Sequence, residues 1–372
     1  MRKRLAIVLI ALSMGCVEVY QPPEIEGAEN LLVVDGFLNG TDGTAVVKLT
    51  RSQNVLSEGA PTNESGASVT LEEEGGGTYP LIEYESGVYA ANGLALQSTS
   101  KYKLHIQTFG GKQFESDLVE LRNTPPIDSI TWRIGNFGLE IMANTHDDTG
   151  QSLYYKWDFV ETYAYSSVFE SVVYFENGDV FPRNELINRC YLNVPSTKIA
   201  IGTSTKLGRD LIREQVINII PPKDIRTRIR YSILVKQSVL TKEAYDFWLG
   251  VQKNTQNLGT LFDPLPSQID GNLRGVNGTT DPVLGYFYGS YVQEKRIFIS
   301  SSQLPPYFFS VDNRGCVLDT VLVEDLPDFH GPYLLTSPVT VGGIMLIGYG
   351  FAPTYCVDCR YYGGTTQQPD YW

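Results

Sequence analysis

The chain has 372 residues and a formal net charge of −13, and only 19% of its residues are charged. So acidic a chain lacks the basic surface that nucleic-acid binding requires, and it gains nothing from electrostatic docking on anionic lipid. Its 23 tyrosines and 35 glycines are typical of an extracellular protein built mainly from β-strands. Its length suggests two or three domains.

The first sixteen residues have the pattern of a secretory signal. Three basic residues at 2–4 precede an apolar run at 5–12, which is shorter than the roughly 20 residues of a membrane-spanning helix. The ending Ser13-Met14-Gly15-Cys16 is similar to the bacterial lipobox, in which the cysteine thiol receives diacylglycerol before cleavage. We therefore expect a signal peptide over residues 1–15 and a lipid anchor on Cys16. An ordinary cleavage site is the alternative.

Residues 16–30 are polar, acidic and contain Pro22-Pro23, so they predict a flexible tether behind the lipid. Removing residues 1–15, which carry three basic side chains and no acidic ones, leaves a net charge of −16. Early acidic residues after the cysteine resemble the surface-export signal of Bacteroidota lipoproteins. We expect an outer-membrane protein that faces the cell exterior, with the periplasmic face as the alternative.

Short alternating segments separated by turns fill residues 31–124. The clearest are residues 67–72 and 102–107, which alternate as half-buried strands do. Residues 124–126 (Thr-Pro-Pro) mark a boundary, and alternation resumes over residues 125–238. The pattern predicts a mainly β fold with tandem immunoglobulin- or fibronectin-like β-sandwiches over 31–124 and 125–238.

Residues 239–372 predict a mixed, loop-rich α+β domain with one clear helix. Thr241 is a suitable N-cap, and apolar residues at 244, 247, 248 and 251 share one helical face. That face predicts docking onto a core. Strand-like runs follow at 284–292 and 296–300.

Four cysteines remain after Cys16, which are Cys190, Cys316, Cys356 and Cys359. An even number in an exported protein predicts two disulfides, and three pairings are open. The two-residue gap between Cys356 and Cys359 also occurs in zinc and redox motifs. No second pair has that spacing, and the surrounding residues are loop-like, so we expect structural cross-links.

Aromatic residues gather between residues 286 and 309. They form either a ligand cleft or partner surface, or the packed face of a core. Members that face solvent are the first candidates for binding. The candidates are Tyr286, Tyr288, Tyr291, Tyr307 and Phe308.

Catalytic motifs are not apparent in the sequence. The three histidines, His105, His146 and His330, lie in no metalloprotease, hydrolase or phosphate-binding motif. We expect no catalytic residues, no metal site, no cofactor and no enzymatic activity. A serine–histidine–aspartate triad assembled only by the fold is the alternative.

A set of short motifs in a fixed order resembles the domain of unknown function 4249 family, which comprises Bacteroidota outer-membrane lipoproteins. The motifs are the lipobox at Cys16, Val34-Asp35-Gly36-Phe37-Leu38, Gly66-Ala67-Ser68-Val69, Gly87-Val88-Tyr89, Tyr154-Tyr155-Lys156-Trp157, Glu243-Ala244-Tyr245-Asp246-Phe247-Trp248, Phe262-Asp263-Pro264, Pro266-Ser267, Gly271-Asn272-Leu273, Leu284-Gly285-Tyr286-Phe287 and Cys356-Val357-Asp358-Cys359-Arg360. The resemblance implies a lipoprotein that accompanies a TonB-dependent receptor, and it carries no catalytic assignment.

These observations predict a non-enzymatic accessory or binding subunit of a TonB-dependent transport system. Its expected partners are a membrane, through the lipid, and an outer-membrane β-barrel receptor, together with a nutrient ligand whose identity the sequence does not give. A structural or adhesive surface lipoprotein and a surface hydrolase are the alternatives.

Overall fold

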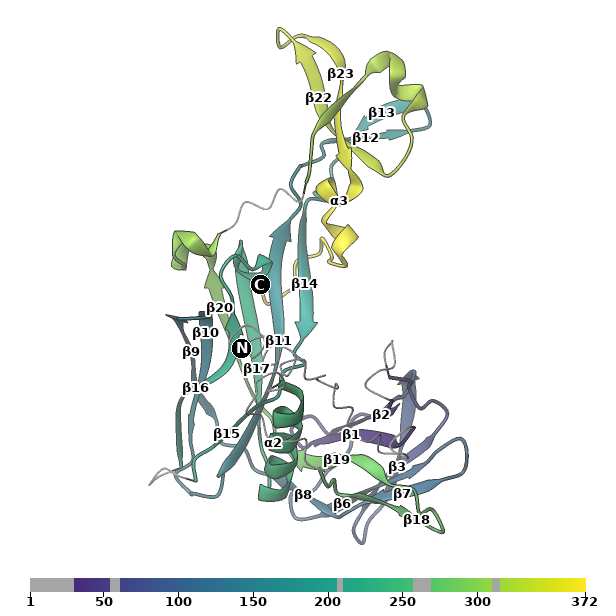
Figure 1. Ribbon diagram of the computed structural model, residues 1–372, viewed down its shortest axis with the longest axis vertical. Coiled ribbons are helices and arrows are strands. Elements are labelled where there is room, and N and C mark those ends of the chain that lie inside the picture. The colour runs from purple at the N-terminus through teal and green to yellow at the C-terminus, as the bar shows by residue number, and fades with distance from the viewer. Residues whose placement is uncertain (1–29, 54–60, 206–209, 257–268, 310–314) are drawn as a thin grey trace, which may run out of the picture.

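The computed structural model describes residues 30–53, 61–205, 210–256, 269–309 and 315–372, which are mainly β-structure. Three parts follow one another along the long axis, namely a barrel, a pair of facing sheets and a small head (Figure 1). Cys16 and nearly all of the expected tether lie outside the described residues. Within the described ranges, no helix is long and apolar enough to cross a membrane.

The barrel is a closed sheet of eight strands in the order β6-β3-β4-β5-β2-β1-β19-β8, with β8 pairing back onto β6. The strands are β1 (Leu32–Asn39), β2 (Thr44–Arg51), β3 (Ser68–Glu73), β4 (Thr78–Glu85), β5 (Val88–Ala91), β6 (Lys101–Gln107), β8 (Val119–Arg122) and β19 (Val283–Ser290). At the other end of β6, β7 (Gln113–Ser116) and β18 (Leu273–Val276) extend the sheet.

This part is not the open sandwich that we expected for residues 31–124. Strand β19 lies between β1 and β8 and runs parallel to both. It pairs with edges that the N-terminal strands would otherwise leave free, so the sheet closes on itself. Inward and outward residues alternate in sandwiches and barrels alike, so alternation predicted the strands but not their closure.

Two glycines explain how closely β1 and β19 approach each other. A Cβ atom on Gly36 would lie 2.8 Å from the ring of Phe287, which fills the barrel interior. Gly285 pairs with Val34 and has φ +113, a conformation that favours glycine. Both glycines belong to the motifs that carry the family resemblance, so those motifs mark the seam that closes the barrel.

The middle part is a β-sandwich in the architectural sense, with two sheets packed over one core. One sheet has the order β16-β10-β9 and comprises β9 (Ile127–Gly135), β10 (Gly138–His146) and β16 (Leu211–Ile220). The other has the order β14-β11-β17-β20, with β15 also beside β11, and comprises β11 (Tyr154–Ser166), β14 (Arg189–Pro195), β15 (Ala200–Thr203), β17 (Arg230–Val239) and β20 (Gln293–Ser300). Short 3-10 helices flank it at Ile225–Thr227, Ser301–Gln303 and Pro306–Phe308.

Helix α2 (Lys242–Gln256) confirms the predicted helix. Thr241 accepts a hydrogen bond from the Ala244 N–H at 3.2 Å and so caps the first turn. The predicted apolar face packs against Tyr286 and Tyr288 on the outside of β19. Both faces of β19 are therefore buried, one in the barrel and the other under the helix.

The head forms around the antiparallel sheet β21-β23-β22. Its elements are β21 (Asp319–Leu322), β22 (Tyr333–Val341), β23 (Met345–Pro353), the 3-10 helices Val323–Asp328 and Cys359–Tyr362, and the short helix α3 (Thr354–Val357). The hairpin of β12 (Val173–Glu176) and β13 (Asp179–Pro182) leaves the sandwich and packs on this sheet, with the Val172 N–H donating to the Thr336 carbonyl at 2.7 Å.

Strand pairing does not follow the division that we expected at residues 124 and 238. Strands β19 and β20 come from the expected C-terminal domain, yet β19 completes the barrel and β20 completes the sandwich. Conversely, β12 and β13 come from the middle region and pack in the head. The chain thus passes repeatedly between parts, which ties them together.

Candidate binding site between the barrel and the sandwich

A partly open cavity of about 330 Å³ lies where the barrel, the sandwich and the first turn of α2 meet. Its size is near the lower end of the range for small-ligand sites. Four separate segments form its wall. The lining residues are Asp117, Leu118, Val119, Glu120, Arg122, Val239, Leu240, Thr241, Glu243, Asn272, Tyr286, Phe287, Tyr288 and Gly289.

Asn272 fixes one side of this cavity. Its amide donates to the Phe287 carbonyl at 2.7 Å and accepts from the Phe287 N–H at 2.8 Å. The Asn272 carbonyl in turn accepts the Asp117 N–H at 2.7 Å. These three bonds tie Asn272 to β19 and to the segment at Asp117 before any ligand arrives.

Charged side chains surround the cavity unevenly. Asp117, Glu120 and Glu243 line it together with one basic residue, Arg122. Arg274 pairs with Asp117, and Lys101 pairs with Glu120 at 3.1 Å, whereas Arg122 donates to the Gln151 carbonyl at 3.3 Å. Asp117 and Glu120 thus already have cationic partners, so the wall offers both hydrogen-bond donors and acceptors, which suit a small polar ligand.

The two tyrosines of this wall are held by aromatic contacts with the helix. Tyr286 lies 5.0 Å from Phe247 and Tyr288 lies 6.4 Å from Trp248, measured between ring centroids. Both are less than a tenth exposed, and burial raises the pKa of each phenol above its ordinary value. They remain neutral at physiological pH and act as walls and hydrogen-bonding groups.

Lys156 is buried behind these rings. Its ammonium lies 4.9 Å from the Trp248 ring centroid and donates to both carboxylate oxygens of Asp158 at 2.5 Å. Burial works to lower its pKa, but Tyr288 and Asp158 outweigh burial and raise it. The charged lysine on β11 therefore holds α2 against the sandwich through its contact with Trp248, and the first turn of α2 lines the cavity.

The other three predicted binding aromatics lie elsewhere. Tyr291 is partly buried and packs against the barrel core, and Phe308 is fully buried in the sandwich core. Only Tyr307, at 55% exposure, faces solvent. The five candidates therefore do not form one surface. Tyr286 and Tyr288 come together at the cavity, whereas the other three do not reach it.

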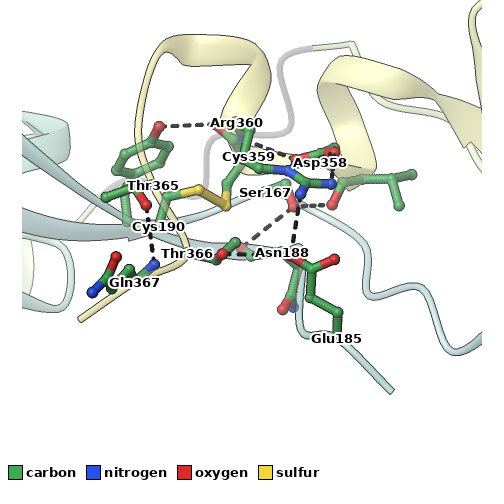
Figure 2. The surroundings of a disulfide bond; sticks show 12 residues. Ser167, Glu185, Asn188, Cys190, Asp358, Cys359, Arg360, Thr365, Thr366 and Gln367 are labelled. Carbon is green, nitrogen blue, oxygen red and sulfur yellow. Dashed lines mark hydrogen bonds and ion pairs between the residues drawn. A yellow bond between two sulfur atoms is a disulfide. The ribbon is translucent and has the colours of Figure 1, made fainter. Parts of the chain in front are cut away.

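All four predicted disulfide cysteines are paired. Cys190 bonds to Cys359 across 169 residues, and Cys316 bonds to Cys356 across 40 residues. The first bond joins the sandwich to the C-terminal segment (Figure 2), and the second lies within the head. The prediction of two disulfides is confirmed, and the Cys356–Cys359 spacing serves two different cross-links instead of a redox or zinc pair.

Polar contacts reinforce the Cys190–Cys359 bond. Arg360 pairs with Asp358 at 2.7 Å and with Glu185 at 3.1 Å, as Figure 2 shows. Although burial raises the pKa of Asp358, hydrogen bonds from Arg360 hold that pKa below its ordinary value. Ser167 also donates to the Val357 carbonyl at 2.6 Å. The C-terminal segment is thus held by more than its sulfur bond.

None of the three histidines lies at the cavity. His105 pairs with Glu72 and Glu115 on the barrel surface, and His146 pairs with Asp128 at 2.7 Å on the sandwich surface. Hydrogen bonding to Asp128 raises the pKa of His146. Within the described ranges, no group of three His, Cys, Asp or Glu side chains could hold a metal ion.

Sequence reasoning missed the polar residues of the cavity, which include Asp117, Glu120, Arg122, Glu243 and Asn272. They stand at strand ends, in a loop and in the first helical turn, where no periodic pattern singles them out. Two of the family motifs were signals for two of them, since Gly271-Asn272-Leu273 contains Asn272 and another motif begins at Glu243. Two other motifs, Phe262-Asp263-Pro264 and Pro266-Ser267, lie outside the described residues.

The fold and the cross-links define a mainly β, disulfide-linked protein whose small cavity lies between a barrel and a sandwich. Residues 18–296 match the family described as "Domain of unknown function (DUF4249)", and the chain belongs to this family. The match confirms the resemblance that the sequence motifs indicated. No curated protein matches the chain.

Proposed function

We propose that this protein is a lipid-anchored outer-membrane subunit that faces the cell exterior. It binds a small ligand and accompanies a TonB-dependent receptor without catalysing a reaction. The lipobox-like Cys16 and the acidic tether support the anchor. The two disulfides support an oxidising compartment outside the cytosol.

The cavity beneath α2 carries the binding role. A protein that acted only as a spacer or adhesin would need no preformed cavity between its parts. The cavity of this protein is lined by two tyrosines and several polar groups. Its wall is already hydrogen-bonded through Asn272. A polar cavity of this size favours a binding subunit over the structural alternative.

The hydrolase alternative would need a nucleophile beside a histidine. His146 and Asp128 form a pair beside an open surface groove, but no serine or cysteine of the described segments hydrogen-bonds to that imidazole. A nucleophile and its base have to lie within hydrogen-bond reach of each other. The arrangement therefore favours a protein without hydrolytic activity.

We also infer that the middle part is fibronectin-like. Its three-stranded sheet β16-β10-β9 faces the strands β14, β11, β17 and β20, which is the division expected of such a sandwich. The last strand of the sandwich, β20, follows α2 and β19 in the sequence. The insertion of these elements before the final strand creates the cavity.

The anchor is tested by replacing Cys16 with serine. We expect the chain to lose incorporation of radiolabelled palmitate, because the thiol that would receive the diacylglycerol is gone. Val17→Ala, one residue later, should leave the labelling unchanged. Palmitate labelling that survives Cys16→Ser would contradict the anchor. Recovery of the anchored chain from detergent-solubilised membranes without a receptor would contradict the partnership.

The cavity is tested by filling it. Leu118 is 42% exposed at its rim. We expect Leu118→Trp to remove the ligand that co-purifies from native membranes, seen as a mass adduct by native mass spectrometry, at little cost in stability. Leu186→Trp, at a residue 61% exposed in another region, is the control and should keep the adduct. An adduct that survives in Leu118→Trp would place the ligand elsewhere.

A further inference from the structure

Strands β22 and β23 form a hairpin at the end of the molecule opposite the barrel (Figure 1). Its turn carries a cluster of exposed apolar side chains. Residues 340–346 are here called the hairpin tip. Ile344 is 92% exposed, Met345 62%, Val341 53% and Leu346 41%. So many adjacent apolar groups in water are unusual for a surface that has no partner.

Folding of the head does not account for this tip. Strand β21 pairs with β23 only as far as Gly348, so the ribbon continues beyond the sheet. The apolar core of the head includes Tyr349 and Phe351 but none of the tip residues. The turn of the tip is nevertheless closed, with Val341 opposite Met345 and the Ile344 N–H donating to the Val341 carbonyl.

The hairpin is uncharged, whereas the segment beside it is acidic. No Asp, Glu, Lys or Arg occurs between residues 331 and 357, which include both strands of the hairpin. The neighbouring segment, β21 with the following 3-10 helix, carries exposed acidic residues at Asp319, Glu324, Asp325 and Asp328 and no Lys or Arg. The tip is therefore an uncharged apolar projection beside an acidic shoulder.

We propose that the hairpin tip is a second membrane contact, which inserts its aliphatic side chains into the interfacial layer of an uncharged or zwitterionic lipid bilayer. An uncharged tip meets one requirement for entering that layer, since no charge has to be desolvated. The acidic shoulder lies outside the layer and opposes binding to anionic lipid.

The side-chain chemistry favours lipid over a protein groove. Protein interfaces are centred on Trp, Tyr and Arg, whereas the tip carries aliphatic side chains, one methionine, threonine and glycine. The described chain begins at residue 30, directly before β1 of the barrel, whereas the tip lies at the opposite end of the molecule.

On the proposed function the wild-type chain carries its own lipid, so the test uses the chain from residue 16 with Cys16→Ser, which has none. The remaining cysteines are all in disulfides, so Ile344→Cys gives a single thiol for a nitrobenzoxadiazole label. With phosphatidylcholine vesicles we expect a blue shift and a rise in emission. Added phosphatidylglycerol should weaken both effects, and salt should restore them.

Flotation with the same vesicles measures binding directly. Replacing Ile344 and Met345 with aspartate should weaken binding by about tenfold or more, because two apolar side chains then carry charge. Phe137→Asp is the matched control, since Phe137 is 76% exposed in the turn between β9 and β10. It should leave binding unchanged, and a label at residue 137 should not respond.

Three results would overturn the proposal. They are no vesicle binding by the unlipidated chain, an equal loss with Phe137→Asp, and stronger binding to anionic vesicles than to phosphatidylcholine. Concentration-dependent self-association that the tip variant abolishes, seen by sedimentation in the absence of vesicles, would assign the tip to a second copy instead. None of these results depends on Cys16, so the anchor stands or fails by its own palmitate-labelling test.

Discussion

Replacing Cys190 and Cys359 with alanine should lower the free energy of unfolding by about 2–5 kcal/mol, the usual range for a native disulfide. The bond closes a long loop, because the two cysteines are 169 residues apart. Without it, the unfolded chain gains conformational freedom that the folded chain does not. Urea denaturation followed by circular dichroism measures the change.

The same replacement should loosen the C-terminal tail. Beyond Cys359 the tail lies along the sandwich, where Thr365 exchanges two backbone hydrogen bonds with Tyr191 at 2.8 and 3.0 Å. The Trp372 ring lies 5.3 Å from that of Tyr191 and 5.9 Å from that of Phe298, measured between centroids. Each contact is weak alone, so we expect faster trypsin cleavage after Arg360 when the disulfide is absent.

Cys316 and Cys356 provide the matched control, because their bond closes a loop of only 40 residues within the head. The dependence on loop length predicts a stability loss about 1 kcal/mol smaller than for the longer loop. Cleavage after Arg360 should also change less. Equal losses in the two double variants would show that loop length does not set the contribution of these bonds.

The strands were predictable from the sequence, but their partners were not. The alternation at 102–107 and the apolar run at 284–292 gave β6 and β19 because burial in a sheet repeats every two residues. Nothing local shows that β19 lies between β1 and β8, since that pairing joins residues more than 150 positions apart. A barrel and a sandwich therefore look alike until the long-range register is known.

The candidate site was predictable to the same degree. Aromatic density around Tyr286 and Tyr288 marked one wall of the cavity, because large side chains on both faces of a strand imply a partner on each face. Asn272 and Glu243 join that wall only because α2 and the segment before β18 fold back on the barrel. Cysteine counting gave two disulfides, but only the fold chose among the three pairings.

The buried carboxylate of Glu161 in the sandwich should be the most sensitive charged group of the described chain. Its oxygens accept from the Arg226 guanidinium at 3.0 and 3.1 Å, from the Tyr231 hydroxyl at 2.7 Å and from the Asn218 amide at 2.9 Å. The residue is 6% exposed. Burial raises the pKa of Tyr231, and the Glu161 charge raises it further, so the phenol stays a donor.

Glu161→Gln should lower the free energy of unfolding by about 3 kcal/mol, near the lower end for breaking a buried ion pair, because Arg226 keeps its bond to Asp224 at 2.7 Å. Glu140→Gln is the control. Glu140 pairs with Arg133, whose side chain is 51% exposed, so that loss should stay below about 1 kcal/mol. Denaturant titration of both variants gives the comparison.

Arg226→Met distinguishes coupling from simple loss of a side chain. Alone it leaves Glu161 charged, buried and short of its strongest partner, so it should cost about as much as Glu161→Gln. Combined with Glu161→Gln, it should cost clearly less than the two single losses added together, since both remove the same interaction. Additive losses would mean that Glu161 and Arg226 act independently, and that packing of the strands around them, instead of their ion pair, stabilises this end of the sandwich.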